Sequence, residues 1–231
     1  MKFKEACVLA LAILGLGAFL YFAMIGVKDR ERVVLVRGLA EKEVAADYVI
    51  WPIVFKEMGN DLAELYATAQ SKSSLLEKFL LENGVKKEEI SYSSPDIVDA
   101  EGEMYDNRQH SLRYTATIVL TVASNNVSLV RQIMGKQSEL LKQGIAFSEN
   151  DYRYRKVFSF NALNDIKPAM IEDATKNARA AAEKFAKDSE SKLGKIKTAS
   201  QGQFSIDDRD ENTPFIKKVR VVTNLQYYLE D

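Results

Sequence analysis

The pattern of apolar and polar positions divides the chain at about residue 28. Residues 6–27 contain no charged side chain, whereas the remaining residues mix apolar, polar and charged positions as a water-soluble domain does. About 20 apolar residues in a helix span the hydrocarbon core of a bilayer, roughly 30 Å thick, and satisfy their own backbone hydrogen bonds there. We therefore predict an N-terminal membrane anchor or signal-anchor over residues 1–28 and a soluble domain over residues 29–231.

A cleaved secretory signal is the alternative for this segment, because Lys2 and Lys4 precede the apolar run. The apolar cores of signal peptides are typically about 7–15 residues long, which is shorter than this run. Bulky Tyr21, Phe22 and Met24 also stand where a cleavage site needs small residues. A retained single-pass helix is therefore favoured. Basic residues flank both ends of the segment, so charge alone leaves its orientation open.

Alternating apolar positions predict strands over residues 33–39 and 48–55. The second strand is apolar on both faces, which indicates a central strand, although Pro52 lacks an N–H and requires a bulge or an edge. A capping box, Asp61-x-x-Glu64, then begins an amphipathic helix that ends at Asn83-Gly84. Strands over 90–97 and 112–122 follow, around a polar loop at 99–110.

A second helix is predicted over 127–143, capped by Asn126 and ended by Gly144, followed by extended residues 145–148 and a strand over 155–160. The longest helix is predicted from Pro168 to residue 193, with Gly194 ending it. Strands over 195–204 and 215–229 form the last hairpin. This order of elements predicts an α+β fold, with three main helices on one face of a mostly antiparallel sheet. Because the last strand closes the chain, we expect it at a sheet edge, available for self-association.

The inventory of reactive side chains argues against an enzyme. The only histidine, His110, lies in a predicted loop, and the only cysteine, Cys7, lies in the apolar segment, so neither a nucleophile–histidine pair nor a zinc site can be assembled. A thiol-free domain also suits an oxidising compartment. We predict no catalytic, cofactor-binding or metal-binding residues.

The remaining candidates for catalysis are carboxylate side chains. They form two clusters, Asp96, Asp99, Glu101, Glu103 and Asp106, and then Asp207, Asp208, Asp210 and Glu211. A calcium site or an acid/base pair is the functional interpretation, but neither cluster has the spacing of a calcium-binding loop. We therefore predict solvated turns.

Two further motifs have plain structural explanations. Residues 152–156 (YRYRK) interleave aromatic and basic side chains, as a surface for single-stranded nucleic acid would. Residues 1–28 hold three of the 32 basic and one of the 33 acidic residues, which leaves the domain 29 against 32 and a net charge of −3. Nucleic acid is therefore not expected as a partner, and strand alternation explains the pattern. Asn126-Val127-Ser128 fits a glycosylation acceptor, but a helix cap is the simpler explanation.

Several stretches together resemble the SIMPL-domain family of bacterial envelope proteins, which includes periplasmic immunogenic and oxidative-stress-defence proteins. Residues 34–38 (VLVRG) resemble the opening strand of the family, Ala46-Asp47 stands where the family usually has Pro-Asp, and residues 84–90 (GVKKEEI) resemble the segment after its first helix. The remaining likeness lies in residues 157–160 (VFSF), in the alanine-rich helix containing Ala174, Ala178, Ala181, Ala182, Phe185 and Ala186, and in residues 192–196 (KLGKI). The alanine pattern is thinner at Asn177 and Asp188.

The resemblance implies an exported, non-enzymatic domain that assembles into homo-oligomers, with a role in envelope stress. It places the domain in the periplasm, or another extracytoplasmic space, with residues 6–27 in the inner (cytoplasmic) membrane. We expect an assembly or interaction module. A stomatin-like scaffold on the cytoplasmic face of the membrane is the alternative in architecture, and an envelope hydrolase that uses the carboxylate loops is the third candidate. The sequence does not identify the protein partner.

Overall fold

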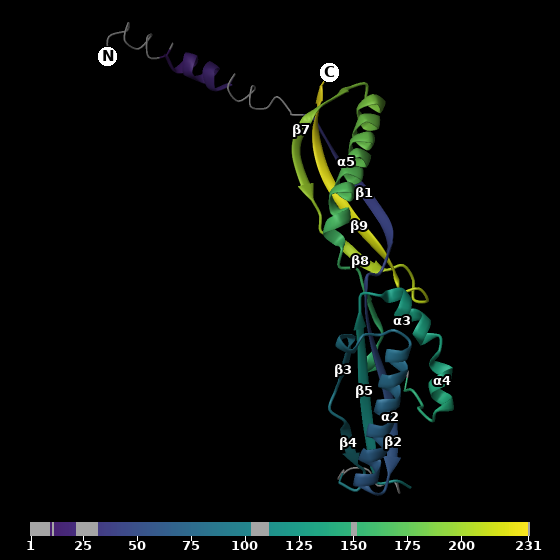
Figure 1. Ribbon diagram of the computed structural model, residues 1–231. Helices are drawn as coiled ribbons and strands as arrows, with labels where there is room; N and C mark the ends of the chain where they lie inside the picture. Colours follow the sequence, from purple (N-terminus) through teal and green to yellow (C-terminus); the bar gives the residue numbers. More distant parts are fainter. Residues whose placement is uncertain (1–9, 11, 22–31, 103–110, 149–151, 231) are drawn as a thin grey trace. The chain divides into compact units, whose positions relative to one another are not determined.

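The described residues form two β-sheets with helices packed against them (Figure 1). The computed structural model describes residues 10, 12–21, 32–102, 111–148 and 152–230. The chain divides into two compact units. Unit 1 comprises Met1–Ala40, Ala169–Gln203 and Val221–Asp231, and unit 2 comprises Glu41–Pro168 and Phe204–Arg220. The α+β class predicted from the sequence is confirmed, but the prediction of one sheet is wrong, because the strands form two separate sheets.

Within the described residues, we find no helix whose length and apolar character would let it cross a membrane. The segment predicted as an anchor, residues 6–27, is described only at residues 10 and 12–21, and these are helical.

The sheet of unit 2 is built around β2 (Tyr48–Gly59) and β5 (Tyr114–Ser124), which pair antiparallel from Val49 to Gly59 without a break in register. The strand order is β3-β5-β2-β6, and β4 also pairs with β5. The outer strands are short: β3 (Ile90–Tyr92), β4 (Asp96–Asp99) and β6 (Val157–Ser159). The strand predicted over 90–97 is thus two strands, because the segment between them contains Pro95, which has no N–H for the ladder.

Helices α2 (Leu62–Glu82), α3 (Val127–Met134) and α4 (Gln137–Lys142) complete unit 2. Helix α2 follows its predicted limits: the carboxylate of Asp61 accepts a hydrogen bond from the Glu64 N–H at 2.9 Å, and Gly84 has a φ of +95° just after the helix. The single helix predicted over 127–143 is interrupted at Gly135, which sequence patterning missed. Apolar side chains of the helices and of β2 and β5, including the fully buried Trp51, form one large core.

Unit 1 contains most of helix α5 (Leu163–Asp188), all of β7 (Lys192–Gln201), and parts of β1 (Val33–Ala45) and β9 (Ile216–Glu230). The strand order is β1-β9-β7, and the short β8 (Ser205–Asp208) pairs with the part of β9 that belongs to unit 2. Strand β9 is therefore central, and its predicted position at a sheet edge is wrong. Although β9 is the last strand in the sequence, β1 pairs with one side of it and β7 with the other. The place of a strand in the chain therefore does not fix its place in the sheet.

The limits of α5 differ from the prediction at both ends. The helix begins before Pro168, at Leu163, and ends at Asp188, where Glu190 takes the left-handed backbone conformation with a φ of 55°. Gly194 lies in β7 and does not end the helix. A Cβ atom there would lie 3.1 Å from the backbone oxygen of Tyr228, so glycine serves close packing between paired strands.

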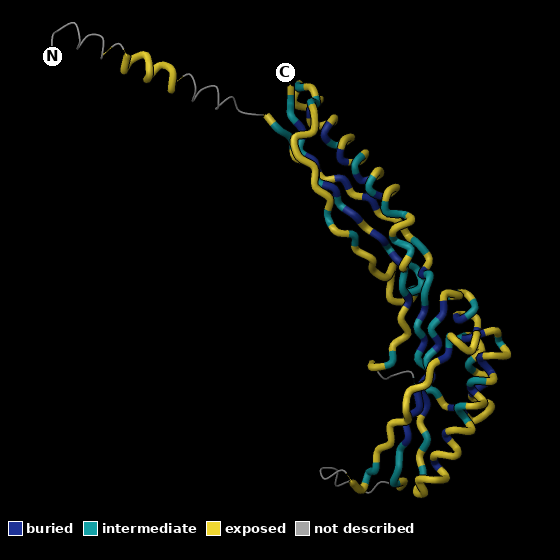
Figure 2. The backbone as a smooth tube through the Cα atoms, turned by 60° about the vertical axis from the view of Figure 1, so that its left-hand side comes forward, coloured by how far each residue is buried: buried dark blue, intermediate teal, exposed yellow. Residues whose placement is uncertain are grey.

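Along each helix and strand, buried residues recur with the period of that element (Figure 2). In unit 1, Val36 on β1 and Leu225 and Tyr227 on β9 pack against Ala178 and Ala182 of α5. The buried alanines of α5 thus form the face on which the helix lies close to the sheet, whereas Phe185, quoted with them in the sequence, is exposed.

Candidate functional site

The first carboxylate cluster is engaged in ion pairs. Asp99 accepts two hydrogen bonds from Arg113, from Nε at 3.0 Å and from Nη2 at 2.9 Å, and Glu101 lies 3.0 Å from Nη1 of the same side chain. The hydrogen bond from Arg113 holds the pKa of Asp99 below its ordinary value. Asp96 is exposed on β4. Glu103, Asp106 and His110 lie outside the described residues.

In the second cluster, Asp210 and Glu211 lie in the turn between β8 and β9, whereas Asp207 and Asp208 lie in β8, so the turn predicted for these two is wrong. Hydrogen bonds from Thr213 and Arg209 lower the pKa of Asp210 to about 2. Asp208 pairs with Lys217, while Asp207 and Glu211 are exposed. In the part of the chain that the structure describes, no group of three or more histidine, cysteine, aspartate or glutamate side chains could hold a metal ion.

The segment 152–156, which the sequence assigned to a strand, is a turn. Tyr152–Tyr154 form one 3-10 turn and β6 begins only at Val157, so the strand interpretation of the aromatic and basic alternation is wrong. Tyr154, Arg155 and Lys156 all line one cavity, whereas a strand would have sent alternate side chains to opposite faces.

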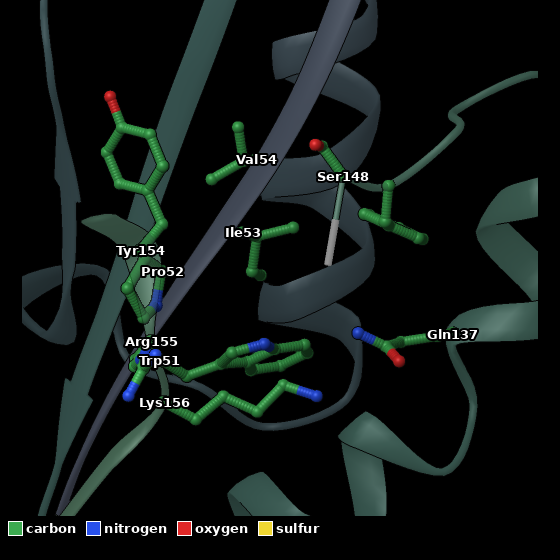
Figure 3. Close-up of a pocket in the computed structure, with 10 residues that line it drawn as sticks. Trp51, Pro52, Ile53, Val54, Gln137, Ser148, Tyr154, Arg155 and Lys156 are labelled. Atoms are coloured by element: carbon green, nitrogen blue, oxygen red, sulfur yellow. The ribbon is translucent and has the colours of Figure 1, made fainter. Parts of the chain in front are cut away.

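This cavity has a volume of about 230 Å³ and lies along β2 (Figure 3). Four consecutive residues of β2 line one side, from Trp51 to Val54. The other walls come from three separate segments and consist of Gln137 at the start of α4, Phe147 and Ser148 after α4, and Tyr154, Arg155 and Lys156 before β6. Among the described residues that line it, Arg155 and Lys156 are cationic.

The cavity exists because β2 lacks a neighbour over a short stretch. Strand β6 pairs with β2 only as far as Ile50, and the next contact on that side is the hydrogen bond from the Ser148 N–H to the Val54 carbonyl at 2.8 Å. Since backbone groups in a strand alternate direction with a period of two, Pro52 presents its carbonyl oxygen to the same side as Val54 and has no N–H to leave unpaired. Pro52 therefore lies at a local edge within an otherwise central strand, which resolves the conflict seen in the sequence.

Strand β1 provides a second surface of interest. Among the described strands, β1 pairs only with β9, so its other side is a sheet edge. The Leu229 N–H donates to the Arg32 carbonyl at 2.8 Å, so the even-numbered residues of β1 direct their backbone groups to β9 and the odd-numbered ones direct them outward. One outward carbonyl, that of Leu39, accepts a hydrogen bond from Nδ2 of Asn177 on α5 at 2.9 Å. Leu35 is 65% exposed.

The Asn126 side chain caps α3, as predicted. Its Oδ1 accepts hydrogen bonds from the Leu129 N–H at 3.1 Å and from the Ser128 hydroxyl at 2.9 Å.

A comparison against protein families identifies the family of this chain. A family described as SIMPL, a protein of unknown function (DUF541), matches residues 34–226. The chain belongs to the SIMPL family. A comparison with curated proteins gave no match.

The structure gives physical roles to several residues on which the resemblance to the family rests. Gly38 lies against α5 so closely that a Cβ atom would stand 1.8 Å from the backbone oxygen of Ala174. The carboxylate of Asp47 accepts hydrogen bonds from the N–H groups of Asn161 and Ala162 at 2.8 Å, and so fixes the chain just before α5. Sequence reasoning quoted these residues only as motif positions. Their roles depend on contacts between segments more than 100 residues apart.

Proposed function

We propose that this SIMPL protein is a single-pass inner-membrane protein whose residues 29–231 form a non-enzymatic assembly module in the periplasm or another extracytoplasmic space. The uncharged run of residues 6–27 supports the anchor, because its length fits a bilayer and bulky residues stand where a signal peptide would be cleaved. The resemblance to exported relatives supports the location of the domain and a role in envelope stress defence.

The observation that carries the assembly proposal is the edge of β1. Apart from the Leu39 carbonyl, which Asn177 already engages, its outward N–H and C=O groups can continue the ladder with a strand from a second copy of the chain. Leu35 places an exposed apolar side chain on this strand, beside those backbone groups. The homo-oligomer expected from the sequence is therefore proposed at β1, in place of the central β9.

The opposite edge of the same sheet is formed by β7, which has features that disfavour pairing with a further strand. Strand β7 has register shifts on both sides of Ile196, and its sequence contains three lysines, at 192, 195 and 197. Irregular register and lysine side chains both discourage the addition of a further strand. The contrast between the two edges favours β1.

The assembly test measures the molar mass of the full-length chain in detergent micelles by light scattering, at tens of micromolar. We expect an oligomer for the wild type and a smaller species for Leu35→Lys, because a charge on an edge strand disfavours pairing. The matched control is Ile196→Lys, which places the same charge on the other edge and should leave the mass unchanged. Circular dichroism confirms that both variants fold. A monomeric wild type would refute the assembly proposal.

Anchoring and orientation have separate tests. Mass spectrometry of the protein in the membrane fraction should find an N-terminus before residue 20. A start after that residue would show cleavage. Added protease should digest the domain in spheroplasts with intact inner membranes. Protection from protease would instead favour the stomatin-like scaffold on the cytoplasmic face.

A further inference from the structure

A second cavity lies within unit 2, between helix α2 and the gap that separates β3 from β4. It has a volume of about 250 Å³. The two short strands follow one another along β5 (Figure 1): β3 pairs with it up to Tyr92, and β4 begins to pair at Asp96. Pro95, in the segment between them, lines the cavity together with Ile118 of β5. The cavity therefore lies where the edge of the sheet is interrupted.

Helix α2 contributes one polar side to this cavity. Tyr66, Gln70, Ser73 and Glu77 all line it, and they follow one another at intervals of four, three and four residues. Residues at such intervals lie on the same side of a helix. The helix thus presents an aromatic ring, an amide, a hydroxyl and a carboxylate to one space.

Several hydrogen-bond donors in the cavity are already used within the protein. The hydroxyls of Ser73 and Ser74 donate to carbonyl oxygens one turn earlier in α2, at 2.8 and 3.0 Å. The Tyr92 hydroxyl donates to the Glu77 carboxylate. A hydroxyl oxygen still has lone pairs after its proton is engaged, and a carboxylate can accept about four hydrogen bonds. These side chains therefore offer acceptors, which suit a ligand that brings N–H donors.

Two exposed tyrosines favour a positive charge on that ligand. Tyr66 is 49% exposed and Tyr92 is 52% exposed, so both have ring surface that a ligand can reach. Aromatic rings attract ammonium groups because the faces of the rings are negative. Glu77 is half-buried, where solvent screens its charge less than at the surface. A carboxylate and two tyrosines in one cavity form a combination that binds a protonated amine.

We propose that this cavity binds a primary ammonium group on a short alkyl chain, with the nitrogen held by Glu77 and the neighbouring serine oxygens, and with the chain against the exposed rings of Tyr66 and Pro95. The volume suits a short chain, because pockets for drug-sized ligands measure roughly 300–1,000 Å³. A free amine and the lysine side chain of a partner protein share this chemistry. The site is independent of the anchor and of assembly through β1, so either proposal can fail without the other.

Isothermal titration calorimetry of the full-length protein in a non-ionic detergent tests the binding, with n-butylamine as the probe. This amine is protonated at neutral pH, as a lysine side chain is. n-Butanol has the same chain without the charge, and tetramethylammonium has the charge without an N–H donor. After subtraction of titrations into detergent alone, we expect saturable binding of butylamine that weakens in high salt. Tetramethylammonium should bind about fivefold more weakly, and butanol should not bind.

Three variants locate the binding. Glu77→Gln should weaken binding of butylamine about tenfold or more, because a hydrogen bond between two charged groups is lost. The matched control is Glu82→Gln, which removes the same charge from an exposed position on the same helix outside the cavity lining and should change the affinity by less than about twofold. Tyr66→Leu should weaken binding about two- to fivefold, because the contact between the cation and the ring is lost. Thermal unfolding by circular dichroism shows whether each variant is folded.

Nα-Acetyl-lysine amide distinguishes the two sources of the ammonium group, because it carries the same butylammonium end on a peptide backbone. Tighter binding than that of butylamine would support a lysine of a partner protein as the ligand, and equal or weaker binding would support a free amine.

The proposal is overturned if butylamine gives no saturable heat by about 10 mM, which is weaker than a Kd of 1 mM by tenfold. It is also overturned if butanol or tetramethylammonium binds as tightly as butylamine, because the charge or the N–H groups would then play no part. Equal weakening by Glu77→Gln and Glu82→Gln would overturn it as well, because general surface charge would then account for the binding.

Discussion

Replacing Gly38 by alanine tests the closest contact in unit 1. The added Cβ atom would lie 1.8 Å from the Ala174 oxygen, 2.6 Å from the Ala178 nitrogen and 2.8 Å from the Ala178 Cβ. Two of these atoms belong to the backbone of α5, so no change of rotamer can relieve the overlap. Ordinary contact begins at 3.4 Å, and the helix would have to withdraw from β1 by about 1.6 Å.

Such a displacement would also separate the buried alanines of α5 from the sheet. Inserting atoms into a well-packed core typically costs about 1–3 kcal/mol, and the backbone overlap places this variant at the upper end or beyond. A loss of about 3 kcal/mol corresponds to a fall in Tm of roughly 6–12 °C in a chain of this size. We expect this fall in thermal unfolding followed by circular dichroism.

The control for this experiment is Gly59→Ala. Its added Cβ atom would find its nearest neighbours, in the Leu65 side chain, at 3.7 Å, which is ordinary contact. Where alanine fits the native backbone, it stabilises by about 0.4–1 kcal/mol relative to glycine, through the unfolded state. The two variants should therefore shift Tm in different directions or by very different amounts. A Gly38→Ala variant as stable as the wild type would refute the close approach of α5 to β1.

Three further predictions concern single side chains. Asp47→Ala should destabilise the fold by about 1–2 kcal/mol in urea unfolding, because two N–H groups before α5 lose their acceptor; an unchanged midpoint would contradict this role. The lowered pKa of Asp210, about 2, means that its stabilising contribution is present above about pH 4 and is lost as the pH falls toward 2, so the difference in Tm between the wild type and Asp210→Asn should vanish over that range. Burial and the Glu77 carboxylate raise the pKa of Tyr92 to about 12, so ultraviolet titration should show a late-titrating component that Tyr92→Phe removes.

The sequence predicted those helix ends at which the capping residue and its hydrogen-bond partners are close together in the chain. Asp61, Gly84 and Asn126 act within three or four residues of their own positions, so their effect can be seen in the sequence. The break at Gly135 was missed because the apolar spacing on both sides continues through it.

Features that join distant segments could not be predicted in the same way. The central position of β9 depends on β1, which lies about 190 residues earlier in the chain. The cavity combines β2 with segments that follow it by about 85 to 105 residues. The sequence did contain one sign of the cavity. Pro52 lies within an apolar strand, and a proline there indicates that β2 has no hydrogen-bonded neighbour on one side at that position.

The alanines of α5 recur every four residues, at 174, 178, 182 and 186, and all four are buried. A helix turns once in about 3.6 residues, so sliding α5 by one turn would place each alanine near the site of the next and preserve the small-residue face. Apolar contact alone therefore defines the axial position of this helix poorly. Two features distinguish the observed register: Gly38, which receives the backbone at Ala174, and Asn177, whose amide reaches the carbonyl of Leu39. Asn177, which departs from the alanine pattern, thus helps to fix the axial position of the helix relative to β1.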